Sequence, residues 1–274
     1  MTGRARNTST GQRWLLVLLG ISALVSLLSM AVPALFDHPL VNNGGELQLY
    51  LDVVEEGNLP TWWSSALLVT TALAHAVTGA SARVAGSRWW PYWFVTAGVL
   101  AVLSLDDHTS LHERLDAVGR HVVAFDSFPF YWIVPGLIAG AAVAGAIAVL
   151  AANVTPPVRV QLLAGVSVLL VAALGGEVAQ GALLVAAETG PLYVLTYHAE
   201  ELGENIGVLL MLSAATTALT ATVREGRIEL VYGRPEDAHR LRHDDATIRL
   251  DRPRATVHVE VGRHRRAATL NQWR

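Results

Sequence analysis

The sequence predicts an all-α integral membrane helix bundle with six transmembrane helices, both termini cytoplasmic, and a small C-terminal tail that is β-rich or disordered. Three observations support this fold class. Of the 274 residues, 52% are apolar and only 16% are charged, whereas roughly 25% are charged in a typical soluble domain. The apolar residues gather in runs of about 20, the length that crosses a bilayer. The basic residues are all arginines, and they flank these runs unevenly.

Six apolar runs are candidates for membrane spans. The third is the shortest, and the first also resembles a signal peptide with a cleavage site near Val32-Pro33-Ala34, which is an open alternative. Every tryptophan except Trp273 falls near the end of a run, as expected for side chains at the bilayer interface. We expect spans at about Trp14–Phe36, Trp62–Ala82, Trp89–Leu105, Phe130–Ala151, Val160–Ala187 and Tyr193–Thr222.

The distribution of charge predicts the orientation of the spans. Arg4, Arg6 and Arg13 precede the first run, and further arginines follow the second and fourth runs. By contrast, residues 37–61 contain five acidic residues and no arginine. Because arginine is enriched in cytoplasmic loops, both termini are expected in the cytoplasm and the acidic loops outside a bacterial plasma membrane.

The chain divides into two predicted parts. Residues 1–222 form the transmembrane domain, with an amphipathic outer loop at 37–61 and an outer helical extension at 106–128. Residues 223–274 form a cytoplasmic tail with 12 arginines and 8 acidic residues. A disordered basic tail beside anionic lipids is one alternative for this part. The other is a set of short strands, for which alternating and β-branched residues indicate Arg227–Tyr232, Thr247–Leu250 and Thr256–Val261.

Several kinds of chemistry are excluded by composition and motif. The chain has no cysteine, which excludes disulfides, iron–sulfur clusters and thiol nucleophiles. It has no glycine-rich phosphate loop, no Gly-x-Ser-x-Gly elbow and no His-Glu-x-x-His motif. The basic tail lacks interleaved aromatic residues, so no nucleic-acid partner is expected. Ionisable residues in or beside the spans are therefore the main candidates, because placing one in a span costs about 3 kcal/mol.

The first polar group follows the third span, in the run Ser104–Leu115. If one helix continues through this run, 100° per residue places Asp106, His112 and Glu113 in one arc. His108 lies in the same run and is a further candidate ligand. A long helix that projects above the bilayer with one polar stripe is therefore expected.

Two further polar groups lie in the fifth and sixth spans. Glu177 has about ten otherwise apolar residues on either side, so it must face the interior of the bundle, with Gln180 one turn away. In the sixth span, His198 and Glu201 share one stripe of the helix, and Glu204 lies beside it. The predicted topology places all three groups toward the outer side.

Carboxylates and imidazoles in this combination predict a metal site. Such side chains from facing helices hold metal ions in helix bundles, and this ligand set suits Zn or Fe. Glu177 and Glu204 are expected to act as catalytic residues, as a general base or as hydrogen-bond partners of the ligands. The expected metal ligands are Asp106, His108, His112, Glu113, His198 and Glu201.

Several of these residues belong to a recurrent pattern. The pattern comprises Asp52-x-x-Glu55-Glu56-Gly57-Asn58-Leu59-Pro60-Thr61-Trp62-Trp63-Ser64-Ser65, Leu103-Ser104-Leu105-Asp106-Asp107, His112-Glu113 and Glu200-Glu201-x-x-Glu204. It resembles a group of multi-pass bacterial membrane proteins over about residues 45–215. In that group an Asp-Glu pair stands where this chain has Asp106-Asp107. The resemblance implies that these residues act together, and it implies no particular reaction.

Three functions remain open at this point. The leading hypothesis is a metal-dependent hydrolase or oxidoreductase that acts on a lipid or lipid-linked substrate delivered by the bilayer. The second is a proton or cation transporter or channel that uses Glu177 and the outer carboxylates. The third is a membrane sensor or scaffold that signals through the tail. Membrane lipids are the expected partners, while homo-oligomer formation and a partner for the tail are open.

Overall fold

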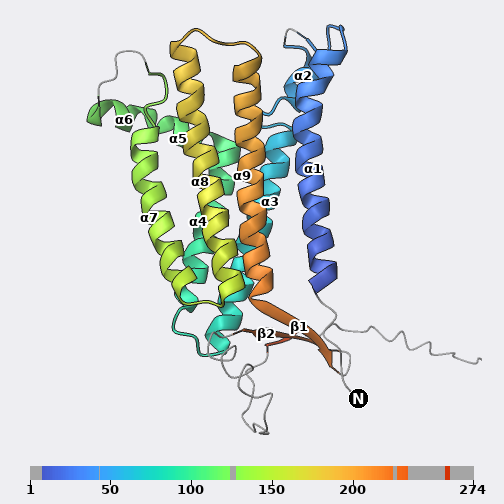
Figure 1. Ribbon diagram of the computed structural model, residues 1–274, viewed down its shortest axis with the longest axis vertical. Helices are drawn as coiled ribbons and strands as arrows, with labels where there is room; N and C mark the ends of the chain where they lie inside the picture. Colours follow the sequence, from blue (N-terminus) through green and yellow to red (C-terminus); the bar gives the residue numbers. More distant parts are fainter. Residues whose placement is uncertain (1–7, 43, 124–127, 225–226, 234–256, 260–274) are drawn as a thin grey trace, which may run out of the picture.

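The structure is a computed structural model, and it describes residues 8–42, 44–123, 128–224, 227–233 and 257–259. Six long helices run side by side in one bundle, and a small sheet lies across one end (Figure 1). The long helices are α1 (Thr8–Leu35), α3 (Leu59–Val84), α4 (Trp90–Thr109), α7 (Ile133–Ala152), α8 (Pro156–Val185) and α9 (Pro191–Thr217). The short ones are α2 (Glu46–Leu51), α5 (Leu111–Arg114) and α6 (Asp116–Val122).

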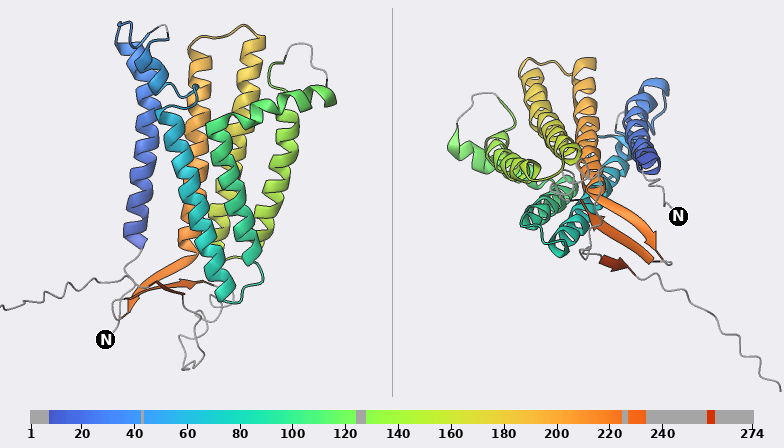
Figure 2. Two further views of the ribbon diagram at one scale, coloured as in Figure 1. Left: turned by 180° about the vertical axis from the view of Figure 1, so that it is seen from behind. Right: turned by 60° about the horizontal axis from the view of Figure 1, so that its bottom comes forward.

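Four of the long helices are long and apolar enough to cross a membrane, which is compatible with a membrane location. They are α1, α3, α7 and α8. The other two, α4 and α9, lie alongside them in the bundle and have similar lengths (Figure 2). They fall outside this class because they contain acidic residues, which include Asp106 and Asp107 in α4 and Glu200, Glu201 and Glu204 in α9.

The bundle has two chemically different ends. The end at which α3 and α9 begin and α4 ends is called here the acidic end, and the opposite one is called the sheet end. Local sequence explains where the helices begin at the acidic end. The side chain of Asn58 caps α3 by accepting a hydrogen bond from the Thr61 backbone N–H, with Pro60 in the first turn. Pro191 occupies the same first-turn position in α9.

The prediction of one continuous helix through residues 104–116 is wrong. Helix α4 ends at Thr109, and Ser110 adopts a left-handed backbone conformation with φ of 47° before the chain continues as α5 and α6. The carboxylate of Asp106 accepts a hydrogen bond from the backbone N–H of His112, at 2.6 Å. This bond stabilises the bend, which directs α5 and α6 sideways over the end of α7 instead of above the bundle (Figure 1).

The sixth predicted span is too long, because α9 ends at Thr217. Leu219–Arg224 instead forms strand β1, which pairs antiparallel with β2 (Arg227–Tyr232), and β2 pairs antiparallel with β3 (Val257–Val259). The predicted boundary at residue 222 therefore falls inside a strand. The strand predicted at Arg227–Tyr232 is present and the one at Thr256–Val261 is present in part, while Thr247–Leu250 lies outside the described residues.

An aromatic contact helps to hold the sheet against the bundle. The indole N–H of Trp93, in α4, donates a hydrogen bond to the hydroxyl of Tyr232, in β2, at 3.2 Å. Trp93 is fully buried and also packs against His75, whose Nδ1–H donates to the Thr71 carbonyl at 2.9 Å. His75 is thus a hydrogen-bonded residue of the bundle interior.

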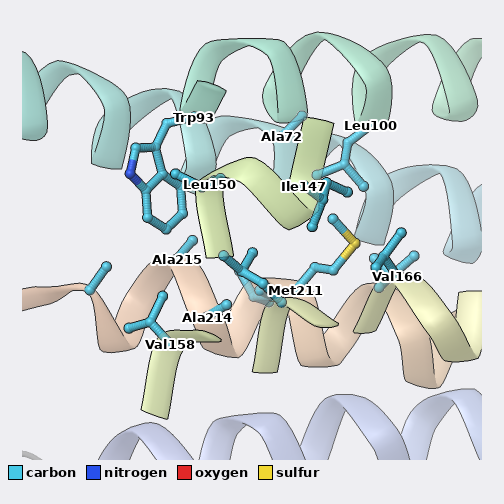
Figure 3. Packing of buried hydrophobic residues seen from close by; sticks show 14 of the residues in the cluster. Ala72, Trp93, Leu100, Ile147, Leu150, Val158, Val166, Met211, Ala214 and Ala215 are labelled. Atoms are coloured by element: carbon cyan, nitrogen blue, oxygen red, sulfur yellow. The ribbon is translucent and has the colours of Figure 1, made fainter. Parts of the chain in front are cut away.

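The sheet end of the bundle is tightly packed. Side chains from five helices interdigitate there, and most of the labelled side chains in Figure 3 are almost fully buried. Helices α8 and α9 approach closely because glycines face each other. A Cβ atom added at Gly207 would lie 2.6 Å from the backbone N of Leu169 and 2.9 Å from the carbonyl O of Gly165. Small residues permit this close contact between helices that cross a membrane.

The substitution Gly207→Ala is expected to lower the free energy of unfolding by about 1–3 kcal/mol, because the methyl group overpacks the contact between α8 and α9. The measurement is thermal unfolding of the purified protein in detergent. Gly98→Ala is the control, since a Cβ atom there has no neighbour within 4 Å. Equal stability of the Gly207→Ala variant and the wild type would contradict the close approach.

Candidate functional site

A cavity of about 510 Å³ lies within the bundle and reaches the acidic end. Helices α3, α4, α7, α8 and α9 surround it, together with α5 and the segment before α3. The described residues that line it include no arginine. The carboxyl groups that line it are Glu55, Glu56, Asp106, Asp107, Glu113, Glu177, Glu200, Glu201 and Glu204. The cavity thus has a polar part lined by carboxyl groups, called here the acidic chamber.

His112 is the only imidazole among the described residues that line the cavity, and its orientation is set by Asp106. Its Nδ1 lies 3.1 Å from Oδ2 of Asp106 and donates a hydrogen bond to it. The ring also packs edge-on against Trp132, with 4.7 Å between centroids. Trp132 is a hydrogen-bond partner of the Glu177 carboxylate, whose second oxygen is buried without a described partner. Three helical segments therefore bring His112 and Glu177 to the same tryptophan.

The charge state of His112 reflects the acidic groups around it. Burial lowers the pKa of His112, but the hydrogen bond and negative charge of Asp106 outweigh this effect, with further contributions from Glu177 and Glu113. Its pKa therefore lies above the usual range. The free Nε2 is available to a cation only when the ring is neutral.

Asp107 is held on the other side of α4 by two hydroxyl groups of α3. Ser64 donates to its Oδ2 at 2.7 Å, and Ser65 donates to the same oxygen at 2.6 Å. Glu56 and Asp106 are close enough to raise the electrostatic potential energy of this carboxylate. Two hydroxyl donors from adjacent residues thus compensate in part for the absence of a cationic partner.

The glutamates of α9 lie beside α8 and above the apolar part of the cavity. The amide of Gln180 donates a hydrogen bond to Glu200, and Gly176 leaves room for that carboxyl group, since an added Cβ atom would lie 2.5 Å from its Cδ. Glu201 and Glu204 interact electrostatically with each other and with Asp107. Their carboxyl groups make no hydrogen bond to a described residue, so both are open to a ligand in the chamber.

The structure brings together most, but not all, of the predicted site residues. Glu177 faces the interior, and it lines the cavity with Asp106, His112, Glu113, Glu201 and Glu204. His108 is exposed and does not line the cavity. Both oxygens of Asp106 accept hydrogen bonds from His112, so Asp106 orients this candidate ligand.

His198 lies apart from the cavity, in the contact between α9 and α1. Its Nδ1–H donates to the Val194 carbonyl at 2.8 Å, and its Nε2 accepts from the Ser29 hydroxyl at 3.1 Å. Ser29 also accepts a hydrogen bond from the Val53 backbone N–H. Both ring nitrogens of His198 are engaged in hydrogen bonds, and the side chain is only 4% exposed. His198 therefore connects three segments and has no ring nitrogen free to bind a metal ion.

No metal site is preformed within the described part of the chain. No three histidine, aspartate or glutamate side chains lie there in an arrangement that would hold an ion as they stand. Within the acidic chamber, mutual repulsion of carboxylates opposes such convergence unless a cation is bound.

Comparison of the chain with curated proteins and with solved structures finds no match. A family model does match, and it covers residues 14–219. Its description is "Domain of unknown function (DUF8692)". The chain belongs to this family. The match includes every helix that surrounds the cavity and excludes most of the sheet.

Several residues of the chamber were absent from the predicted set. Asp107 and Glu200 belonged to the recurrent pattern but were not assigned a role, and Gln180 was noted only as a neighbour of Glu177. The Ser64-Ser65 pair in α3 could have indicated a partner for Asp107. A single sequence, however, does not show that α3 and α4 are neighbours. Their contact becomes evident only in the fold.

Replacing Ser65 by Ala is expected to lower the free energy of unfolding by about 1.5–3 kcal/mol, since it removes a hydrogen bond to a charged group within the bundle. Ser81→Ala is a matched control in the same helix, because the Ser81 hydroxyl binds only the carbonyl of its own helix at Val77. Thermal unfolding in detergent measures both. If the two variants lose the same stability, Ser65 does not hold Asp107.

Proposed function

We propose that this protein is a membrane-embedded enzyme that binds a divalent metal ion in the acidic chamber and acts on a lipid or lipid-linked substrate. The observation that carries the proposal is the orientation of His112 by Asp106. In proteins, a histidine that binds a metal through one nitrogen almost always donates its other ring N–H to a carboxylate, carbonyl or water. His112 has this arrangement, with Nε2 left free.

The residues around His112 supply the rest of a metal site. Glu177 has one oxygen without a described partner, and Glu113 lies on the same short helix as His112. Imidazole with carboxylates is a ligand set that suits Zn or Fe. Such an ion would lower the pKa of a bound water molecule. Glu204, which is within electrostatic range of His112, would then accept the proton.

The shape of the cavity favours an enzyme over a conduction pathway. Its apolar part reaches Ile147, Val166 and Met211. Beyond them, Leu150 and Ala214 are completely buried and close the bundle toward the sheet end (Figure 3). A blind cavity holds a substrate, whereas a channel requires a path to the other side.

The proposal includes six membrane crossings, with α4 and α9 in the bilayer, the acidic end outside and both termini in the cytoplasm of a plasma membrane. The arrangement supports an even number of crossings, because α1 begins and α9 ends at the same end of the bundle (Figure 2). Arg83 and Arg88 lie at that end as well, as expected for the cytoplasmic side.

The orientation can be tested with single cysteines, since the chain has none of its own. A maleimide that does not cross membranes should label Glu46→Cys in intact cells. It should label Ser87→Cys, in the link between α3 and α4, only after the membrane is permeabilised. The reverse pattern would place the acidic chamber on the cytoplasmic side.

Metal binding is tested by elemental analysis and by calorimetric titration of untagged, purified protein with Zn²⁺ and with Fe²⁺. We expect about one ion per chain. The Asp106→Asn variant should bind roughly 10–100-fold more weakly, because it loses the group that orients the ligand. His112→Asn should abolish saturable binding.

His108→Asn is the matched control, because this histidine is exposed and lies four residues from His112. It should bind metal as the wild type does. The proposal is wrong if the wild-type protein binds neither ion saturably, or if His112→Asn and His108→Asn bind equally well.

A further inference from the structure

The cavity has a second part with the opposite chemistry. Below the carboxylates, toward the sheet end, it is lined by side chains of α4, α7, α8 and α9 that are almost all apolar. They include Leu100, Val143, Ile147, Val166, Leu170 and Met211. This part is called here the apolar compartment. One continuous space thus joins a chamber of carboxylates to a compartment of hydrocarbon side chains, which is the surface pattern of an amphipathic ligand.

The carboxylates exceed what one metal ion can balance. The proposed ion would face His112, Glu113 and Glu177, whereas Asp107, Glu201 and other acids lie on the α3 and α9 side of the chamber. No arginine is found among the described lining residues. Glu201 and Glu204 are half-buried, and their carboxyl groups make no hydrogen bond to a residue that the structure describes. A ligand with its own positive charge would satisfy them.

The packing of α4 against α7 changes along the bundle. Toward the sheet end, both helices contribute to one buried apolar cluster, α4 through Trp93 and Leu100 and α7 through Ile147 and Leu150 (Figure 3). Nearer the acidic end, Val102 of α4 and Ala139 of α7 both line the cavity and are both exposed. An opening between these two side chains would face the side of the bundle, where α4 and α7 are neighbours. An amphiphile could therefore enter from the bilayer.

From these observations we propose that the cavity binds an amphiphile with a cationic amine head group and a single alkyl chain, the amine in the acidic chamber and the chain in the apolar compartment. This inference rests on the proposed function in that it names the substrate class of the same cavity. Size limits the chain. At roughly 30 Å³ per water-sized group, a cavity of about 510 Å³ holds about 17 such groups, which is enough for an amine and one alkyl chain but not for two long chains.

Thermal unfolding tests the proposal, because a ligand that binds only the native state raises the unfolding temperature. The protein is treated with EDTA and placed in phosphatidylcholine nanodiscs, and dodecylamine, dodecanol or dodecanoate is added. We expect a saturable increase with dodecylamine, and none with dodecanoate, which the carboxylates repel. Equal shifts with dodecylamine and dodecanol would overturn the requirement for a cationic head group.

Three variants separate the two parts of the cavity. Glu204→Gln should weaken the apparent affinity for dodecylamine at least about tenfold. Val143→Trp should abolish the shift by filling the apolar compartment. Ile138→Trp, on the same helix but 71% exposed and outside the cavity, should leave the shift unchanged. If Val143→Trp responds like Ile138→Trp, the alkyl chain does not occupy the compartment.

A failure of the amphiphile proposal can be distinguished from a failure of the proposed metal site. Val143 does not contact the residues around His112 that would hold the ion, so Val143→Trp should titrate with Zn²⁺ as the wild type does. Loss of dodecylamine binding with metal binding retained supports both assignments. Metal binding without any dodecylamine response overturns only the present inference, and a dodecylamine response without metal binding overturns only the proposed function.

Discussion

The arrangement of this protein depends on carboxyl groups that are placed inside a helical bundle without arginine partners in the described cavity wall. Isolated buried carboxylates are costly, so each must be compensated by hydrogen bonds, by a proton or by a cation. Hydroxyl groups of α3 do this for Asp107, and an amide of α8 does it for Glu200. Glu201 and Glu204 have no such protein partner, and this unmet requirement is the physical basis for assigning a cationic ligand to the chamber.

The scaffold separates rigidity from function along the length of the bundle. Near the sheet end, small residues and fully buried apolar side chains hold α8 against α9 and join α4 to α7. Near the acidic end, the helices leave space, and a bend at Ser110 turns α5 across the top of the cavity. The packed half thus fixes the positions of helices whose other ends carry the polar groups. Such support is what a precise binding site requires.

The sequence was sufficient to predict the long helices and the interior position of Glu177, because apolar runs and the cost of a carboxylate in lipid are local properties. It could not show which face of α9 meets which neighbour. The stripe that contains His198 and Glu201 therefore seemed to be one site, although His198 faces Ser29 of α1. The bend at Ser110 was missed because it depends on a hydrogen bond that the His112 backbone N–H, in the next segment, donates to Asp106. The strand at Leu219–Arg224 was missed because its β-branched and apolar residues also fit a span.

The most direct test is whether α5 and α8 place their polar side chains against each other, and chemical cross-linking can measure it because the chain has no native cysteine. If cysteines replace His112 and Glu177, a short bifunctional thiol reagent should link the two, since both native side chains contact Trp132. The cross-link is detected by mass spectrometry after proteolysis. Cysteines in place of His108 and Glu177 should not be joined. Cross-linking of the second pair and not the first would show that His112 points away from the chamber.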